Sequence, residues 1–203
     1  MPCNLSPETI DKTIAFHGHT CPGLAIGIRA AELALRELGD SPEVNMVAVS
    51  ETDMCGVDAI QFITSCTYGK GNFLHRDYGK MAFSFYDRNS GKGFRAMVKP
   101  GIKDEIDNEL AVLMRKDDNG SITPAESERI TVLREISRQL FMTLELDEMF
   151  VISQPNEPVP TPARVLESMV CECCNESIME SRSRRLGGKT LCIPCFSAQE
   201  QKV

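Results

Sequence analysis

Two cysteine pairs near the end of the chain have the residue type and spacing of a metal site. Cys171 and Cys174 form one CxxC pair, and Cys192 and Cys195 form another after a gap of seventeen residues. Four thiolates at this spacing are typical of structural zinc sites, in which they hold a tetrahedral ion. We therefore predict that these four cysteines bind structural zinc. Cys173 is a fifth thiol nearby, and CxxC geometry favours Cys174 over it.

A second group of metal-binding residue types lies near the other end of the chain. His17, His19 and Cys21 alternate along one short segment, and Cys55 follows about thirty residues later. Imidazole and thiolate suit zinc and other borderline-soft metals, but alternate residues converge on one ion only if the segment bends. We predict that His19, Cys21 and Cys55 hold zinc or another transition metal in the core.

The position of these thiols also bears on their chemistry. Pro22 is expected at the first position of a helix, which makes Cys21 the N-cap, where backbone N–H groups and the helix dipole stabilise a thiolate. Cys55 is expected in an equivalent place, between a strand and a helix. Such thiols suit metal binding, redox chemistry or nucleophilic attack, and the alternative is that they are small buried core residues.

Three further residues are candidates for proton transfer or ligand binding. His17 is a candidate proton shuttle, and Asp58, one helical turn beyond Cys55, is placed to orient a ligand or accept a proton. Lys70 lies in a glycine-rich segment where it can meet an anion, although a simple turn is the alternative. Cys66 is expected about 16 Å from Cys55 along a straight helix, too far to share an ion.

The elements that must position these residues follow from apolar periodicity and from capping signals. Helices and strands do not alternate regularly, so the order favours an α+β fold over a doubly wound α/β sheet. Ser6-Pro7 and Thr123-Pro124 followed by Glu126 have the pattern of helix N-termini. The predicted helices cover 7–16, 22–38, 56–65, 102–115 and 124–144, and the predicted strands cover 44–50, 81–86, 94–98 and 150–152.

The chain is expected to divide into three parts. Residues 1–153 form the α+β core domain, and residues 154–165 form a linker whose prolines keep it extended. Residues 166–203 form a small zinc-ribbon or treble-clef module, with Gly187-Gly188 as the turn between two strands. Such a short segment has almost no apolar core, so its metal supplies much of its folding free energy.

Composition narrows the classes of protein further. The formal net charge of −7 argues against a surface that coats nucleic acid throughout. No apolar run is long enough to span a bilayer, and the first residues lack a secretory pattern, so we expect a cytoplasmic protein and no membrane partner. One local basic group remains, at Arg182, Arg184, Arg185 and Lys189; it is either a contact surface for nucleic acid or an acidic partner, or a solvated hairpin tip.

Several separated motifs occur in the order of a known family. The sequence resembles the FmdE family of formylmethanofuran dehydrogenase proteins, and the cysteine module resembles a zinc-finger extension found in some members. The resemblance implies an α+β core that forms an intertwined homodimer, with the His/Cys motifs lining a cleft. Its name implies association with a molybdenum or tungsten enzyme of one-carbon metabolism. The motifs are Phe16–Leu24, Glu51–Gln61, Cys66–Asn72 and Asp77–Lys80.

The sequence leaves three functions open. The favoured one is a zinc-binding, dimeric regulatory or interaction protein whose core binds a metal or small ligand and whose zinc finger contacts protein or nucleic acid. The alternative is a metal- or thiol-dependent enzyme, or an accessory subunit related to formylmethanofuran dehydrogenase. A third hypothesis makes both metal sites structural, with a dimeric scaffold as the product. No complete catalytic set is present to decide whether a reaction is catalysed.

Overall fold

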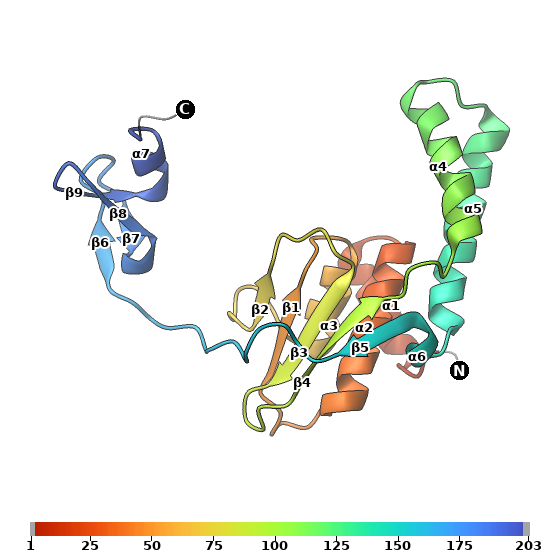
Figure 1. Cartoon of the computed structure of the whole chain (residues 1–203), viewed down its shortest axis with the longest axis horizontal. Coiled ribbons are helices and arrows are strands. Elements are labelled where there is room, and N and C mark those ends of the chain that lie inside the picture. The colour runs from red at the N-terminus through yellow and green to blue at the C-terminus, as the bar shows by residue number, and fades with distance from the viewer. Residues whose placement is uncertain (1–2, 201–203) are drawn as a thin grey trace. The chain divides into compact units, whose positions relative to one another are not determined.

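The chain folds into two compact units, seen in a computed structural model that describes residues 3–200 (Figure 1). The first unit spans Met1–Pro162 and places helices against a five-stranded mixed sheet. The second unit spans Ala163–Val203 and contains two short hairpins and a short helix. The predicted α+β class with a small C-terminal module is thus confirmed, and residues 201–203 of that module lie outside the described part.

The sheet of the first unit has the strand order β2-β1-β3-β4-β5. β1 pairs with β2 in parallel, and the other neighbours are antiparallel, with Ser50 opposite Phe83 in the β1–β3 pair. β2 is a short edge strand that the sequence analysis did not predict. The strands are β1 (Met46–Ser50), β2 (Phe73–His75), β3 (Ala82–Asp87), β4 (Gly93–Val98) and β5 (Phe150–Ser153).

The helices of this unit begin and end close to where their capping signals predicted. Ser6 accepts a hydrogen bond from Thr9 N–H, and Thr123 and Glu126 form a reciprocal capping box. The four-residue helix α6 was not predicted, because it is shorter than any periodic signal. The helices are α1 (Pro7–His17), α2 (Pro22–Leu38), α3 (Gly56–Thr64), α4 (Asp104–Asp118), α5 (Pro124–Thr143) and α6 (Leu146–Met149).

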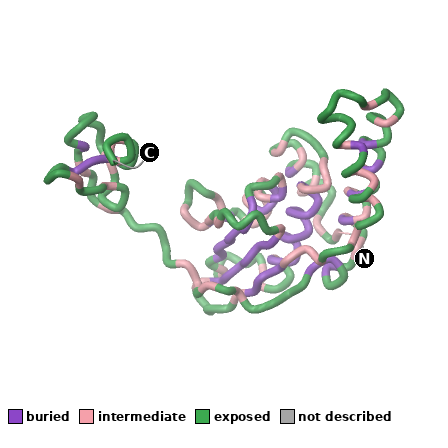
Figure 2. The backbone as a smooth tube through the Cα atoms, turned by 45° about the horizontal axis from the view of Figure 1, so that its top comes forward, coloured by how far each residue is buried: buried purple, intermediate pink, exposed green. Residues whose placement is uncertain are grey.

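The main core lies between the sheet and α2, where the buried residues gather (Figure 2). Ala30, Leu33 and Ala34 of α2 pack there with Phe83 and Phe85 of β3, all of them almost fully buried. α4 and α5 form a hairpin that projects beyond the sheet (Figure 1) and has a small core of its own. None of the helices in the described part of the chain is long and apolar enough to cross a membrane.

α2 and α3 cross at a pair of glycines, Gly27 and Gly56. A β-carbon built on Gly27 would lie 2.1 Å from the Gly56 carbonyl oxygen, and one on Gly56 would lie 2.9 Å from the Gly23 carbonyl oxygen. Backbone therefore lies directly on backbone, and no larger residue fits at Gly27 without moving a helix. Since Cys55 immediately precedes α3, this contact also sets the position of Cys55 beside Gly23.

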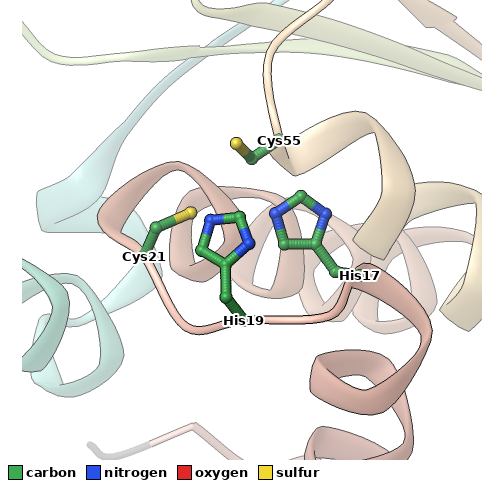
Figure 3. A group of neighbouring side chains, drawn as sticks. All are labelled: His17, His19, Cys21 and Cys55. Carbon is green, nitrogen blue, oxygen red and sulfur yellow. The ribbon is translucent and has the colours of Figure 1, made fainter.

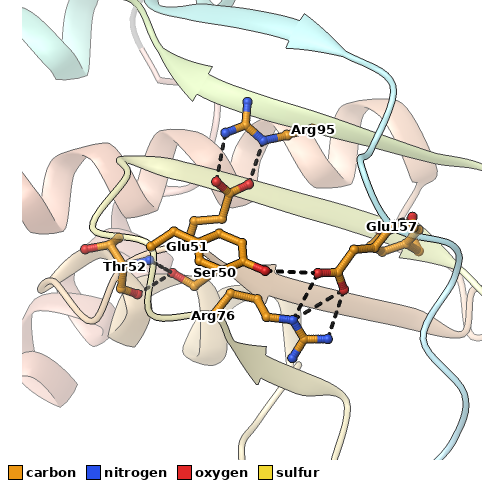
Figure 4. Close-up of polar contacts among 8 residues, drawn as sticks. Ser50, Glu51, Thr52, Arg76, Arg95 and Glu157 are labelled. Carbon is orange, nitrogen blue, oxygen red and sulfur yellow. Dashed lines mark hydrogen bonds and ion pairs between the residues drawn. The ribbon is translucent and has the colours of Figure 1, made fainter.

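The proline-rich segment after β5 is held against the outer face of the sheet. Arg76 pairs with the Glu157 carboxylate at 2.9 Å, and Tyr86 donates to the Glu157 carbonyl oxygen at 3.1 Å (Figure 4). Arg88 donates to the carbonyl oxygens of Pro160 and Thr161. An extended segment makes no internal hydrogen bonds, so its free carbonyl groups accept from these side chains. The expectation of a linker free of the core from residue 154 was therefore wrong.

The same face of the sheet holds a buried ion pair. The Arg95 guanidinium donates to both oxygens of Glu51 at 2.6 and 2.9 Å (Figure 4). These hydrogen bonds lower the pKa of Glu51, and the carboxylate in turn raises the pKa of Arg95. A bidentate pair of this kind satisfies two charged groups that burial would otherwise penalise. It ties β4 to the segment that follows β1.

The second unit consists of two antiparallel hairpins and a helix that follows the second hairpin. β6 (Ser168–Val170) pairs with β7 (Ser177–Met179), and β8 (Ser183–Leu186) pairs with β9 (Lys189–Cys192). A 3₁₀ turn over Glu180–Arg182 joins the hairpins, and α7 (Ile193–Ser197) follows β9. Gly187 and Gly188 both have positive φ and form the predicted turn. The helix after the second hairpin is the arrangement of a treble clef rather than a ribbon.

The glycine crossing leads to a first prediction. Gly27→Ala should lower the free energy of unfolding by about 3 kcal/mol or more, because the added methyl group overlaps the backbone of α3. Gly69→Ala is the matched control, since a β-carbon there meets nothing within 4 Å. Urea unfolding monitored by circular dichroism measures both variants. Equal stability of the two variants would show that the crossing tolerates a side chain.

Candidate functional site

The core site begins at the end of α1, where Gly18 turns the chain. Gly18 has φ +93°, and its N–H donates to the Ile14 carbonyl oxygen at 2.8 Å. A residue with a β-carbon is strained in this left-handed conformation. The turn brings the rings of His17 and His19 to a centroid distance of 4.4 Å. Gly18 thus supplies the bend that convergence of this segment requires.

The two thiols of the site lie at the starts of α2 and α3. Cys21 is the N-cap of α2, and its sulfur accepts a hydrogen bond from Leu24 N–H at 3.3 Å, as predicted. Cys55 precedes α3, but its backbone is helical and its side chain makes no capping bond. The expectation that both thiols cap a helix was therefore wrong for Cys55. Burial, together with the adjacent Cys21 thiol, raises the pKa of Cys55 instead.

Four side chains from these segments converge on one point (Figure 3). One nitrogen or sulfur atom from each of His17, His19, Cys21 and Cys55 lies within 4.8 Å of all the others. Ligand atoms around a tetrahedral zinc ion lie roughly 3.5 Å apart, so small side-chain rotations bring this group to coordination distance. His19 is exposed, whereas the other three are partly buried. A second metal site in the core is thus possible, and it includes His17 beside the three expected ligands.

The hydrogen bonding of His17 fits a metal ligand. Its Nδ1 atom lies 2.7 Å from an Asp58 carboxylate oxygen, which can only accept, so Nδ1 carries the proton. The other ring nitrogen, Nε2, then offers a lone pair to the cluster. This atom is buried and has no hydrogen-bond partner among the described residues. Metal-binding histidines commonly have such a carboxylate on their second nitrogen, which fixes the ring orientation.

Two other candidates from the sequence lie outside this cluster. Lys70 is exposed or nearly so and lines a different hollow together with Phe16, Phe62 and Tyr68. Cys66 is fully buried, and its thiol donates to the Met46 carbonyl oxygen at 3.3 Å. Burial raises the pKa of Cys66. Cys66 is therefore a core residue, and the part played by Lys70 stays a prediction.

The second candidate metal centre lies in the C-terminal unit. Cys171 and Cys174 come from the turn after β6, Cys192 ends β9, and Cys195 lies in the first turn of α7. Their sulfur atoms all lie within 4.8 Å of one another. Cys173 is exposed and stands outside this group, and its sulfur accepts a hydrogen bond from Gln199 at 3.5 Å. The group fits structural zinc.

The electrostatics of this second centre also favour a cation. Backbone N–H groups of Cys174 and Cys192 lower the pKa of Cys171 to about 6. The hydrogen bond with Cys192 and burial raise the pKa of Cys195. Thiols packed this closely cannot all ionise together without a positive charge between them, and a bound zinc ion deprotonates its thiol ligands.

The fold and the two centres define a class of protein: an α+β domain with a His/Cys cluster, followed by a four-cysteine zinc finger. Comparison with protein families agrees. The family model described as "FmdE, Molybdenum formylmethanofuran dehydrogenase operon" matches residues 16–151, and the "Prokaryotic dksA/traR C4-type zinc finger" model matches residues 166–201. The first match covers more than half of the chain. The chain therefore belongs to the FmdE family and carries a C4-type zinc finger.

Two similar proteins come from other organisms. The crystal structure of a tungsten formylmethanofuran dehydrogenase FmdE-like protein from Syntrophus aciditrophicus is 26% identical, with a TM-score of 0.61; the match covers 96% of this chain and 94% of that one. A "Probable S-adenosyl-L-methionine-binding protein" from Archaeoglobus fulgidus is 27% identical over 195 residues, which is 89% of this chain and 50% of the relative. The chain thus spans about half the length of this curated relative.

The sequence analysis missed the arginine side chains that face the core cluster from α5. Arg134 and Arg138 lie one helical turn apart, and both line a cleft that also contacts His19 and Cys21. Nothing in the sequence near residue 20 indicates this pairing, because the two segments are more than a hundred residues apart. The one local signal was the four-residue spacing of two cations on a single helix face.

The His17–Asp58 contact leads to a second prediction. Asp58→Ala should weaken binding of the core metal by about 10- to 100-fold, because the His17 ring loses the acceptor that fixes its orientation. Asp11→Ala removes an exposed carboxylate from α1 and is the control. Competition with a chromophoric zinc chelator measures both. Unchanged affinity in the Asp58 variant would show that the contact does not support metal binding.

Proposed function

We propose that the chain is a metal-binding regulatory or interaction protein. Its core holds zinc, or another borderline-soft metal, through His17 Nε2, His19, Cys21 and Cys55. Its zinc finger contacts a protein or nucleic-acid partner. The observation that carries the core assignment is the buried, unpartnered Nε2 atom of His17, held by Asp58 beside three further metal-binding side chains within residues 3–200.

The number of ligands supports binding over catalysis. Structural zinc sites use four protein ligands, whereas catalytic zinc sites use three and leave a fourth position to water or substrate. The cluster offers four side chains, so a bound ion can be fully coordinated by the protein. A site of this kind senses or stores a metal without turnover.

One observation favours the second candidate, a metal- or thiol-dependent enzyme or an accessory subunit related to formylmethanofuran dehydrogenase. His19 is exposed, unlike the other three members of the cluster, so it is the ligand that a substrate or water can replace. Asp58 and His17 then orient the ion, and Lys70 remains a candidate for contact with an anion. The names of the family and of the Syntrophus protein point to the same area of one-carbon metabolism.

The name of the Archaeoglobus relative adds a ligand to test, S-adenosyl-L-methionine. The chain spans about half of that relative, so the name does not decide which part of it binds the ligand. In the present chain, the cleft beside the core cluster is the place where such binding would be sought, since metal-binding side chains and arginines meet there.

The partner surface of the zinc finger is proposed to be its basic hairpin. Arg184 and Arg185 are exposed on β8, and Lys189 is exposed on β9. The two arginines donate only to a neighbouring carbonyl oxygen and to the Thr190 hydroxyl, and neither has a carboxylate partner within residues 3–200. Cations without a carboxylate partner are available to phosphates or to an acidic protein surface.

We also propose that the chain forms a homodimer and works in the cytoplasm. The α4–α5 hairpin carries exposed apolar side chains, Val112 at 53%, Val132 at 43% and Ile136 at 43% exposure. Apolar side chains concentrated on a projecting hairpin favour burial against another surface, and a second copy of this chain is the proposed partner. The mass of the chain in solution tests this arrangement.

The proposed core site leads to a third prediction. Purified wild-type chain should contain two zinc ions, and Cys21→Ser should contain one, because the substitution removes a ligand from the core cluster alone. Cys3→Ser is the control, since Cys3 belongs to neither cluster and should leave both ions bound. Elemental analysis by mass spectrometry gives the counts. Two ions in the Cys21 variant would refute the core site.

The basic hairpin leads to a fourth prediction. The full chain should bind a single-stranded oligonucleotide at low salt, with affinity falling linearly on a log–log plot against salt concentration. Arg184→Gln should reduce the slope by roughly one unit, because one phosphate contact is lost. Fluorescence anisotropy measures this. If no binding is detected at low salt, the partner is a protein and not nucleic acid.

A further inference from the structure

A cleft of about 430 Å³ borders the core cluster on the side that faces α5. One wall comes from the cluster itself and the start of α2, and the other comes from a single face of α5. Its size is that of a small-molecule site and too small for a macromolecule. The lining residues are His19, Thr20, Cys21, Pro22, Thr131, Arg134, Glu135 and Arg138.

The charges of the α5 wall do not cancel. Arg138 donates two hydrogen bonds to Glu135, at 2.7 and 2.5 Å, and this contact lowers the pKa of Glu135 to about 2. The pair is therefore ionised and neutral as a whole. Arg134 donates only to the Met114 sulfur at 3.6 Å, a weak acceptor, and pairs with no carboxylate in the described part of the chain. The cleft thus keeps one uncompensated guanidinium.

The opposite wall adds to this positive potential. α2 starts at Pro22, inside the cleft, and is seventeen residues long. The N-terminus of a helix carries a partial positive charge from its aligned peptide dipoles. The hydroxyl groups of Thr20 and Thr131 line the same space and can donate hydrogen bonds. A guanidinium, a helix N-terminus and two hydroxyls surround one small volume.

We propose that this cleft binds a small oxyanion, a metabolite with a carboxylate or phosphate group that pairs with Arg134. Guanidinium forks match both groups with two parallel hydrogen bonds. The anion is held between α5 and the start of α2, and the rest of the molecule lies beside His19, the exposed member of the cluster. In that last respect alone, the inference rests on the proposed metal site and names the ligand class that the site serves.

The test is a calorimetric titration of the zinc-loaded full chain at low ionic strength with inorganic phosphate and, separately, with succinate. Arg134→Gln should weaken binding by about tenfold or more, the loss expected for a charge-assisted hydrogen bond. Arg129→Gln is the matched control on the same helix. Arg129 is exposed, pairs with Glu109 and does not line the cleft, so its loss should leave anion affinity unchanged. The probe that binds more tightly identifies the anionic group.

The outcomes separate this inference from the proposed function. If neither anion binds, or if both arginine variants bind like the wild type, the oxyanion site is refuted, whatever the zinc content. Zinc content, measured on the same samples and on the Cys21→Ser variant, decides the metal site independently. If Cys21→Ser keeps two zinc ions while Arg134→Gln still loses anion affinity, the metal site fails and the oxyanion site stands.

Discussion

The contact of Gly27 with Gly56 is the constraint on which the core site depends. With backbone against backbone, α2 and α3 lie as close as two helices can, and the starts of both helices meet at the same end of the unit. Cys21 and Cys55 lie at those starts, so their separation is set by packing of main chain, not by flexible side chains. A rigid support of this kind is what a metal site needs, because ligands must hold their geometry before the ion binds.

The remaining ligands come from the end of α1, which reaches the same point through the turn at Gly18. Three helix ends therefore meet, one carboxyl end and two amino ends. The amino end of α2 favours negative charge, which suits both a thiolate and a bound anion. The Asp58 carboxylate contacts His17 through Nδ1, which leaves Nε2 of the same ring for the cluster. Charge and geometry thus serve the same group of side chains.

The sequence predicted the parts of this structure that depend on local signals. Capping residues and prolines marked the starts of α1, α2 and α5, and the CxxC pairs marked the zinc finger. It did not predict β2, which is held by pairing with β1, nor the attachment of residues 157–161 to the sheet through Arg76, Tyr86 and Arg88. It also assigned His17 to proton transfer, because the free nitrogen of that ring depends on Asp58, forty-one residues away. Each of these features rests on contacts between distant segments.

The two units differ in what keeps them folded, and this difference matters in the cell. The first unit buries a large apolar cluster between sheet and helices, which is independent of any ion. In the described part of the finger, the buried cluster consists of Cys171, Leu191 and Cys192, and two of these belong to the zinc-binding group. When zinc becomes scarce, the finger should lose its shape first, while the core keeps its fold. The supply of one nutrient would then decide whether the chain presents one surface or two.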